Sequence, residues 1–307
     1  MAVIGEVREV KQAGTMARLY GRKVQWPCMA VKLIAIDVDG TLLDSQWQVP
    51  EANRKAVAEA AARGIEVVLV TGRRFDFALP IARQLHPSVI LIVNNGALVK
   101  ALDGTTHLRQ LLPCATARAV LVATPEFRAG AAVVFDRPRE NQVVFEHIDW
   151  EDPERRNYFA RNRTFLAECS PLEQCLTEDP IQVMFTGPVE RMRAVNARLC
   201  AMPFSHQFAL AITEYQARNF ALVDVVRAGC SKGATLARWA AHRGFARGEV
   251  MAIGDNLNDR EMLEFAGLPV VMGNCVPELR ELGWPVTLTN DQSGVAAAIE
   301  AYALGAD

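Results

Sequence analysis

The chain of 307 residues contains no apolar run that approaches the ~20 residues of a membrane-spanning helix. It also lacks an excess of positive charge: 33 lysines and arginines stand against 35 aspartates and glutamates, for a formal net charge of −2. Dedicated nucleic-acid binders usually carry a strongly basic face. We therefore expect a globular protein that binds neither membranes nor nucleic acids, and its length is sufficient for two domains.

No two cysteines form a CxxC pair, and their number is odd. This pattern favours free thiols in a reducing cytoplasm over a disulfide framework, so we expect a cytoplasmic location. The five histidines sit near no cysteine cluster, and the sequence therefore does not indicate a zinc site. The seven cysteines are Cys28, Cys114, Cys169, Cys175, Cys200, Cys230 and Cys275.

Residues 1–28 lack the features of a targeting segment. They contain no serine and no continuous apolar stretch, whereas five lysines and arginines stand against two glutamates. A secretory signal peptide would need an apolar core, and an organelle-targeting peptide is usually rich in serine. We interpret this stretch as a disordered arm, or as the result of a start assigned too far upstream, because Met29 stands just before the first predicted strand.

The segment VKLIAIDVDGTLLD at residues 31–44 is the first that indicates a functional site. Its five apolar residues before Asp37 predict a short strand that is buried on both faces, as in a parallel sheet. The strand ends in Asp37 and Asp39, followed by glycine and threonine. In open α/β sheets, ligands bind outside the carboxyl ends of the strands. An aspartate-rich turn without function is the alternative, but two aspartates in this context favour a site.

Strands and helices then alternate. The strand that begins the segment 65–74 ends in Thr71 and Gly72, and a hydroxyl with close backbone amides suits an oxyanion such as phosphate. An ordinary β-turn would explain these residues equally well. The alternation predicts a parallel α/β sheet. The further predicted elements are a helix at 50–64, a helix at 75–85 and a strand within 89–99 that ends at the sequence Asn94-Asn95-Gly96.

The alternation of parallel strands and helices stops at about residue 100 and resumes near residue 230. Between them we predict helices at 114–127, 151–167 and 188–200, a hairpin around the sequence DRPREN, and β-like runs at 181–187, 206–214 and 219–226. After them follow helices at 233–243, 259–266, 276–282 and 293–303, with strands at 250–254 and 268–274 and a run at 285–290. We therefore expect an α/β core made of residues 29–99 and 227–307, interrupted by an α+β domain at 100–226.

Further polar residues follow the later elements of the core. Asp255, Asn258 and Asp259 come after the strand at 250–254, and Lys232 opens the helix at 233–243. If the strands share a sheet, these side chains meet Asp37 at one edge. Carboxylate oxygens suit Mg²⁺, and an ammonium group suits a phosphate. Taken alone, each residue has an ordinary explanation; Asp259, for instance, would serve as a helix cap.

Four segments resemble the motifs of the haloacid dehalogenase (HAD) superfamily of phosphatases: DVDGTLL at 37–43, VTGR at 70–73, SKG at 231–233 and GDNLND at 254–259. The sequences NNGALV and VVMGN are similar to its Cof-type branch, and the resemblance covers residues 31–307. It implies a Rossmann-like core of parallel strands with a large α+β cap of the C2 type inserted after the third strand. It also implies Mg²⁺ as cofactor and a small phosphorylated metabolite as substrate.

The resemblance further implies a role for each matching residue. Asp37 would be the nucleophile that forms an aspartyl phosphate, and Asp39 would be the general acid and base. Thr71, with Gly72 beside it, and Lys232 would hold the phosphoryl oxygens, and Asn258 is a further candidate for phosphate binding. Asp37, the backbone carbonyl of Asp39 and Asp255 would bind Mg²⁺, with Asn258 and Asp259 supporting the metal and the lysine.

Two other functions remain open at this point. A phosphomutase would pass the phosphoryl group from the enzyme to a second hydroxyl of a sugar. A regulatory receiver module accepts a phosphoryl group on an aspartate without being an enzyme, but Asp39 would provide a base for turnover, and a receiver lacks the insert. We identify no residue that indicates the substrate or the oligomeric state.

Overall fold

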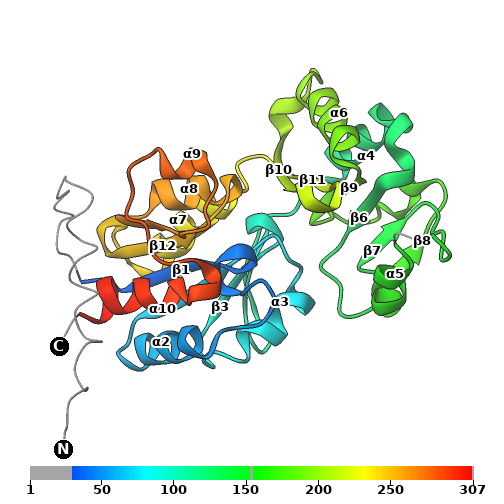
Figure 1. Ribbon diagram of the computed structural model, residues 1–307. Coiled ribbons are helices and arrows are strands. Elements are labelled where there is room, and N and C mark those ends of the chain that lie inside the picture. Colours follow the sequence, from blue (N-terminus) through cyan, green and yellow to red (C-terminus); the bar gives the residue numbers. More distant parts are fainter. Residues whose placement is uncertain (1–29, 153–154, 306–307) are drawn as a thin grey trace, which may run out of the picture.

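The computed structural model describes residues 30–152 and 155–305. Our interpretation of residues 1–28 lies outside this part of the chain. Two sheets, of seven and six strands, organise it. They form two lobes that lie side by side (Figure 1), and we refer to the seven-stranded sheet with its helices as the first lobe and to the other as the second lobe. Within the described ranges, no helix combines the length and the apolar character needed to cross a membrane.

The sheet of the first lobe has the strand order β13-β12-β1-β2-β3-β4-β5. The five strands from β13 to β3 are parallel, which confirms the predicted α/β class. Strand β1 lies in the middle, where Ile36 is paired with Leu69 on one side and Ile253 on the other. The strands are β1 (Leu33–Asp37), β2 (Glu66–Val70), β3 (Ile90–Val93), β4 (Leu98–Ala101), β5 (Thr106–Arg109), β12 (Val250–Gly254) and β13 (Leu268–Val271).

Strands β4 and β5 were not expected in this sheet. The sequence places the start of the insert at residue 100, whereas β4 pairs antiparallel with β3, and β5 with β4, so that the first sheet continues to Arg109. The cause is a tight reversal after β3. Asn94, Asn95 and Gly96 have φ values of 51°, 54° and 103°, and three consecutive residues in this region turn the chain back along β3.

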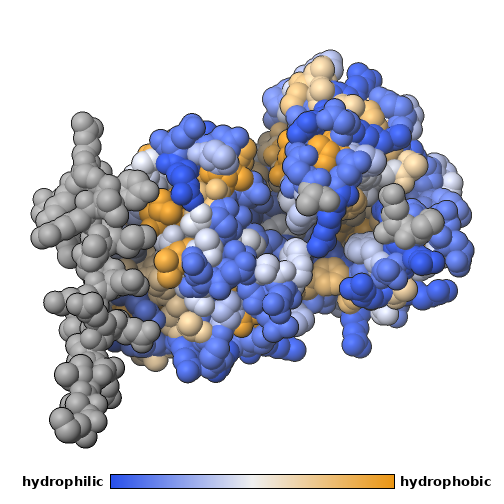
Figure 2. Space-filling model, in the orientation of Figure 1, coloured by the Kyte–Doolittle hydropathy of each residue, from blue (hydrophilic) through white to orange (hydrophobic). Residues whose placement is uncertain are grey.

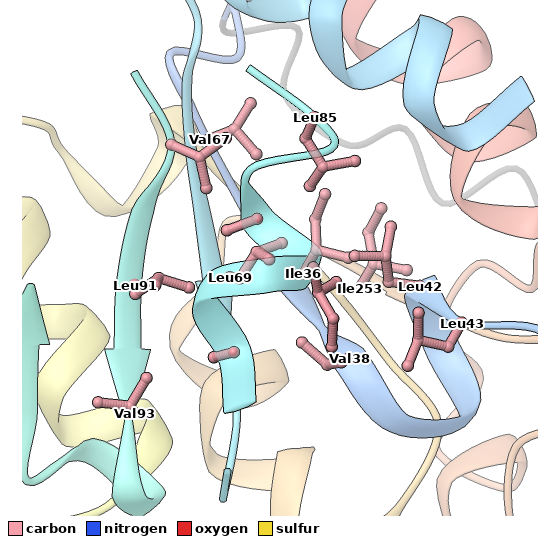
Figure 3. Packing of buried hydrophobic residues seen from close by; sticks show 14 of the residues in the cluster. Ile36, Val38, Leu42, Leu43, Val67, Leu69, Leu85, Leu91, Val93 and Ile253 are labelled. Carbon is pink, nitrogen blue, oxygen red and sulfur yellow. The ribbon is translucent and has the colours of Figure 1, made fainter. Parts of the chain in front are cut away.

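Helices cover both faces of the first sheet. Along β1, Ile34 and Ile36 point to one cluster of buried side chains, and Leu33 and Ala35 point to another, as the two-residue period of a strand requires. Figure 3 shows the first cluster, with Ile36 close to Leu42. That face carries α2 (Glu51–Ala62), α3 (Phe75–Ala82) and α10 (Gly294–Ile299), and the other carries α7 (Lys232–Arg243), α8 (Arg260–Phe265) and α9 (Pro277–Arg280).

The second lobe contains the sheet β10-β11-β9-β6-β7-β8, in which only β7 and β8 pair in parallel. The hairpin predicted around DRPREN is confirmed as β6 and β7. The helix predicted over 151–167 is too long, because Leu166 pairs with Val143 and begins β8. The elements are α4 (Cys114–Ala123), β6 (Ala131–Val134), β7 (Val143–Phe145), α5 (Arg156–Asn162), β8 (Leu166–Glu168), β9 (Gln182–Gly187), α6 (Val189–Cys200), β10 (Phe208–Tyr215) and β11 (Phe220–Arg227).

The surface agrees with the composition. On the face shown in Figure 2, hydrophilic residues cover most of both lobes, and hydrophobic residues form small scattered patches. The six cysteines of the described ranges are free thiols, as predicted. The chain passes from the first lobe to the second between β5 and α4, and it returns between β11 and α7.

Candidate active site

The polar residues predicted at the strand ends meet at one edge of the first sheet. Asp37 is the last residue of β1, Thr71 follows β2 and Asp255 follows β12, and β1 lies between the other two strands. Lys232 begins α7, which packs over the same edge. A cavity of about 440 Å³ lies here, lined in the first lobe by Asp37, Asp39, Gly72, Lys232, Asp255 and Asn258 among others.

Lys232 is a buried cation shared by two buried carboxylates. Its Nζ donates to Oδ1 of Asp37 at 2.6 Å and to Oδ1 of Asp259 at 2.7 Å. Burial opposes the charge of Lys232, but Asp259 and Asp37 outweigh it and raise the pKa of the lysine. Burial, and then repulsion by Asp259, raise the pKa of Asp37 well above its usual range, although Lys232 acts in the opposite direction. The site thus holds more negative charge than one lysine neutralises.

Asp255 belongs to the same group of charges. Its pKa is raised to about 7 by burial and by repulsion from Asp259, while a hydrogen bond from Thr41 Oγ1 to its Oδ1, at 2.8 Å, favours the ionised form. Gly40 allows the close approach of the first loop to this carboxylate. It has a φ of 86°, and a Cβ at this position would lie 2.5 Å from Oδ2 of Asp255. Glycine is therefore required at position 40 for two reasons: it allows the positive φ angle, and it leaves room for the carboxylate of Asp255.

Asp259 does not cap α8 with its side chain, as its sequence position suggested, but it joins the loop before α8 to Lys232. Its side chain is fully buried, and its Oδ2 accepts hydrogen bonds from the backbone N–H groups of Asp255 and Asn256 at 3.1 and 3.2 Å. These bonds cap the turn that leads into α8. Its Oδ1 accepts the bond from Lys232. The cap fixes the carboxylate, and the fixed carboxylate positions the lysine.

Three buried carboxylates form a candidate metal site. One oxygen each from Asp37, Asp255 and Asp259 lie within 4.8 Å of one another. An all-oxygen donor set of this charge fits a hard divalent cation such as Mg²⁺. A cation there would also relieve the repulsion that raises the pKa values of Asp37 and Asp255. The carboxylate of Asp39 lies outside this group, and the binding of a metal by its backbone carbonyl, which the resemblance implies, stays a prediction.

Asp39 is instead held by an arginine that the sequence reasoning did not assign. Arg73 Nε donates to Oδ2 of Asp39 at 2.9 Å and to Oδ1 at 3.1 Å, and Arg73 Nη2 donates to Oδ1 at 2.5 Å. Both side chains remain about one quarter exposed. Arg73 directly follows the phosphate-binding candidates in VTGR, and this position could have identified it as a residue of the site.

The predicted phosphate-binding residues are not equally placed. Gly72 and Asn258 line the cavity. Thr71 is 1% exposed and does not line it; its Oγ1 accepts a hydrogen bond from the backbone N–H of Arg73 at 3.1 Å. The hydroxyl of Thr71 therefore shapes the loop in this structure.

Comparison with known proteins identifies the family. A family model described as haloacid dehalogenase-like hydrolase matches residues 34–299. This chain belongs to that family. It is 30% identical over 288 residues to Phosphatase YwpJ of Bacillus subtilis, which covers 87% of this chain and 98% of the relative. It is 27% identical over 296 residues to the 5-amino-6-(5-phospho-D-ribitylamino)uracil phosphatase YcsE of the same organism, with 92% and 99% covered. A solved haloacid dehalogenase-like hydrolase from Bacillus subtilis has a TM-score of 0.72 and 26% identity, over 88% of this chain and 99% of that one. The resemblance seen in the motifs is thereby confirmed, and the chain is a phosphatase of this family.

The second lobe of this HAD-like phosphatase supplies a wall of the cavity that sequence reasoning missed. The most buried residue of that wall is Asp224, whose oxygens accept hydrogen bonds from Asn95 Nδ2 at 3.0 Å and Gln182 Nε2 at 2.6 Å. Burial raises the pKa of Asp224 to about 7, against the effect of the bond from Asn95. In the sequence, a single aspartate within an apolar strand does not indicate a binding site. The wall consists of Thr213, Glu214, Tyr215, Leu222 and Asp224.

Proposed function

We propose that this phosphatase is a Mg²⁺-dependent enzyme that hydrolyses small phosphorylated metabolites through an aspartyl phosphate on Asp37. The observation that carries the proposal is the position of Asp37. Its carboxylate stands at the end of the central strand, lines the cavity, and is paired with the buried Lys232 at 2.6 Å. A buried, oriented carboxylate beside a cation is suited to attack phosphorus, since a nucleophile that forms a covalent intermediate divides one difficult hydrolysis into two steps.

In the first step, an oxygen of Asp37 forms a bond to phosphorus as the bond from phosphorus to the ester oxygen breaks. Asp39 donates a proton to the departing alcohol. In the second step, Asp39 takes a proton from a water molecule, whose oxygen attacks the phosphorus and releases Asp37 and inorganic phosphate. Lys232, which is bonded to Asp37, would hold the phosphoryl oxygens and so stabilise charge in both steps.

Mg²⁺, when held by Asp37, Asp255 and the backbone carbonyl of Asp39 with Asp259 behind them, supplies the positive charge that a phosphate dianion needs to approach a carboxylate. The pair between Arg73 and Asp39 bears on the proton transfers. A guanidinium prefers an ionised carboxylate, so protonation of Asp39 would loosen the pair. We infer that Arg73 orients Asp39 between the two transfers.

The size of the cavity supports a small substrate. A space of about 440 Å³ closed on one side by the second lobe suits a metabolite better than a folded phosphoprotein. The relative YcsE is named for a small phosphate ester, a phosphoribitylamino-uracil, which supports the same class. We therefore expect the second lobe to act as a cap that contacts the part of the substrate beyond the phosphate.

The test is the release of inorganic phosphate from a panel of sugar and nucleotide phosphates, with Mg²⁺ or with EDTA. We expect turnover with Mg²⁺ only, and its loss in Asp37→Asn with the fold retained by circular dichroism. Asp103→Asn, at an exposed turn of the first lobe, is the matched control and should keep full activity. Conversion of a sugar phosphate to an isomer without phosphate release would contradict hydrolysis, and full activity of Asp37→Asn would contradict the nucleophile.

A further inference from the structure

A second cavity, of about 360 Å³, lies between the two lobes and shares no lining residue with the active site. In the first lobe it is bounded by the start of α3 and by strands β4 and β5. In the second lobe it is bounded by the loop that joins β6 to β7. Five of its lining residues are cations: Arg74, Lys100, Arg109, Arg137 and Arg139.

The cavity carries a net positive charge after its internal ion pairs are counted. Its two acidic lining residues, Asp76 and Asp136, leave an excess of three cations. Asp136 is shared by Lys100, at 2.6 Å from its Oδ1, and by Arg109, at 3.1 Å from its Oδ2. Arg137 pairs with Glu178, which does not line the cavity, and this lowers the excess to two. Two positive charges match a phosphate dianion.

Arg74 is the cation that most needs a partner. Its guanidinium donates to amide oxygens, of Gln142 at 3.0 Å and Asn162 at 3.4 Å, and within residues 30–152 and 155–305 no carboxylate forms an ion pair with it. Burial lowers the pKa of Arg74, whereas the nearby Asp76 acts in the opposite direction, and the guanidinium lies over the rings of Phe77 and Phe165. An anion in the cavity would supply the directly bonded anionic partner that this partly buried cation lacks.

We propose that this cavity is a second binding site, for a small phosphate ester. Its occupant would contact both lobes and would hold them at one separation. The site is also joined to the active site through neighbouring residues: Arg74 follows Arg73, and Asn94, which lines the second cavity, precedes Asn95, which lines the first. Given the proposed function, occupancy should therefore change the turnover number at saturating substrate.

The binding test is equilibrium dialysis of the full chain in EDTA, with inorganic phosphate and glycerol 3-phosphate as probes. Without a metal, the four active-site aspartates outnumber Lys232 and Arg73 and repel phosphate, so binding in EDTA reports the second cavity. We expect one probe per chain, and a dissociation constant that rises about tenfold or more in Arg74→Gln, as expected for the loss of a charged hydrogen bond.

Two further variants make the result specific. Arg109→Gln, at a side chain that is 58% exposed, tests the site with little risk to folding and should also weaken binding. Arg243→Gln, which removes a surface pair with Glu66 and lines neither cavity, should bind like the wild type. The site is refuted if neither probe binds in EDTA at millimolar concentration, or if Arg74→Gln and Arg109→Gln, with unchanged melting temperatures, bind like the wild type.

A kinetic arm tests the coupling. With p-nitrophenyl phosphate and Mg²⁺, glycerol 3-phosphate should change the turnover number in the wild type and not in Arg74→Gln, whereas competition at the active site would change KM alone. Binding in EDTA without any effect on the turnover number would contradict the coupling. If no turnover is found under any condition, the proposed function fails while dialysis still decides the second site.

Discussion

Replacement of Asp224 by asparagine should remove a large part of the pH dependence of stability. Asp224 is 5% exposed, and the groups that donate to it, Asn95 and Gln182, are neutral amides. Its pKa is about 7 in the folded chain, against an ordinary value of 3.8. Between these values the folded chain holds a proton that the unfolded chain has lost, so the free energy of unfolding falls as the pH rises from about 4 to about 7. Each pKa unit corresponds to ~1.4 kcal/mol, so the full loss is about 4 kcal/mol at most.

The assay is urea unfolding of the wild type and Asp224→Asn in EDTA, at several pH values between 4 and 8. We expect the difference between their free energies of unfolding to change by up to about 4 kcal/mol across this range, in favour of the variant at high pH. Other buried carboxylates titrate in both proteins and cancel in the difference. Asp103→Asn, at an exposed turn, should follow the wild type. Parallel curves for the wild type and Asp224→Asn would refute the reasoning.

Two other substitutions test the charges and the space around Asp255. Lys232→Met leaves Asp37 and Asp259 without their shared cation and should cost roughly 3–5 kcal/mol, visible as a lower melting temperature that Mg²⁺ partly restores. An unchanged melting temperature would show that the lysine does not hold these carboxylates together. Gly40→Ala should weaken the response of activity to Mg²⁺ because its Cβ would meet Asp255 at 2.5 Å, whereas Gly64→Ala, with a φ of 83° and nothing within 4 Å, has the same backbone strain without the clash. Equal effects of the two glycine variants on Mg²⁺ dependence would show that space beside Asp255 is unimportant.

The sequence predicted the centre of the first lobe well because its signals are local. A continuous apolar strand that ends in Asp37 places that residue at a sheet edge, whatever the rest of the chain does. The same reasoning located Asp255 and Lys232, and the structure brings all three together. Their catalytic roles remain proposals.

Other features depend on contacts that a local pattern does not contain. The reversal at residues 94–96 rests on positive φ angles at two asparagines, which looked like an ordinary strand end, so the end of β4 and all of β5 were assigned to the insert. Strand β8 begins within the charged stretch 151–167, for which the sequence predicted a helix. Asp224 and Arg74 face cavities only because residues of the two lobes that are far apart in the sequence pack against each other.

Trapping of the covalent intermediate tests the central claim most directly. The full chain, with Mg²⁺, would be mixed with a ³²P-labelled phosphate ester and quenched in acid within milliseconds, and one portion would be counted for protein-bound ³²P. A second portion would be reduced with tritiated borohydride, which expels the phosphate and converts a phosphorylated aspartate to labelled homoserine, and then digested for mass spectrometry. The account predicts protein-bound ³²P and one tritium-labelled site, at residue 37, with more label in Asp39→Asn when the leaving group needs no acid, and none in Asp37→Asn. Phosphate release without any labelled protein, or label on a residue other than Asp37, would contradict it.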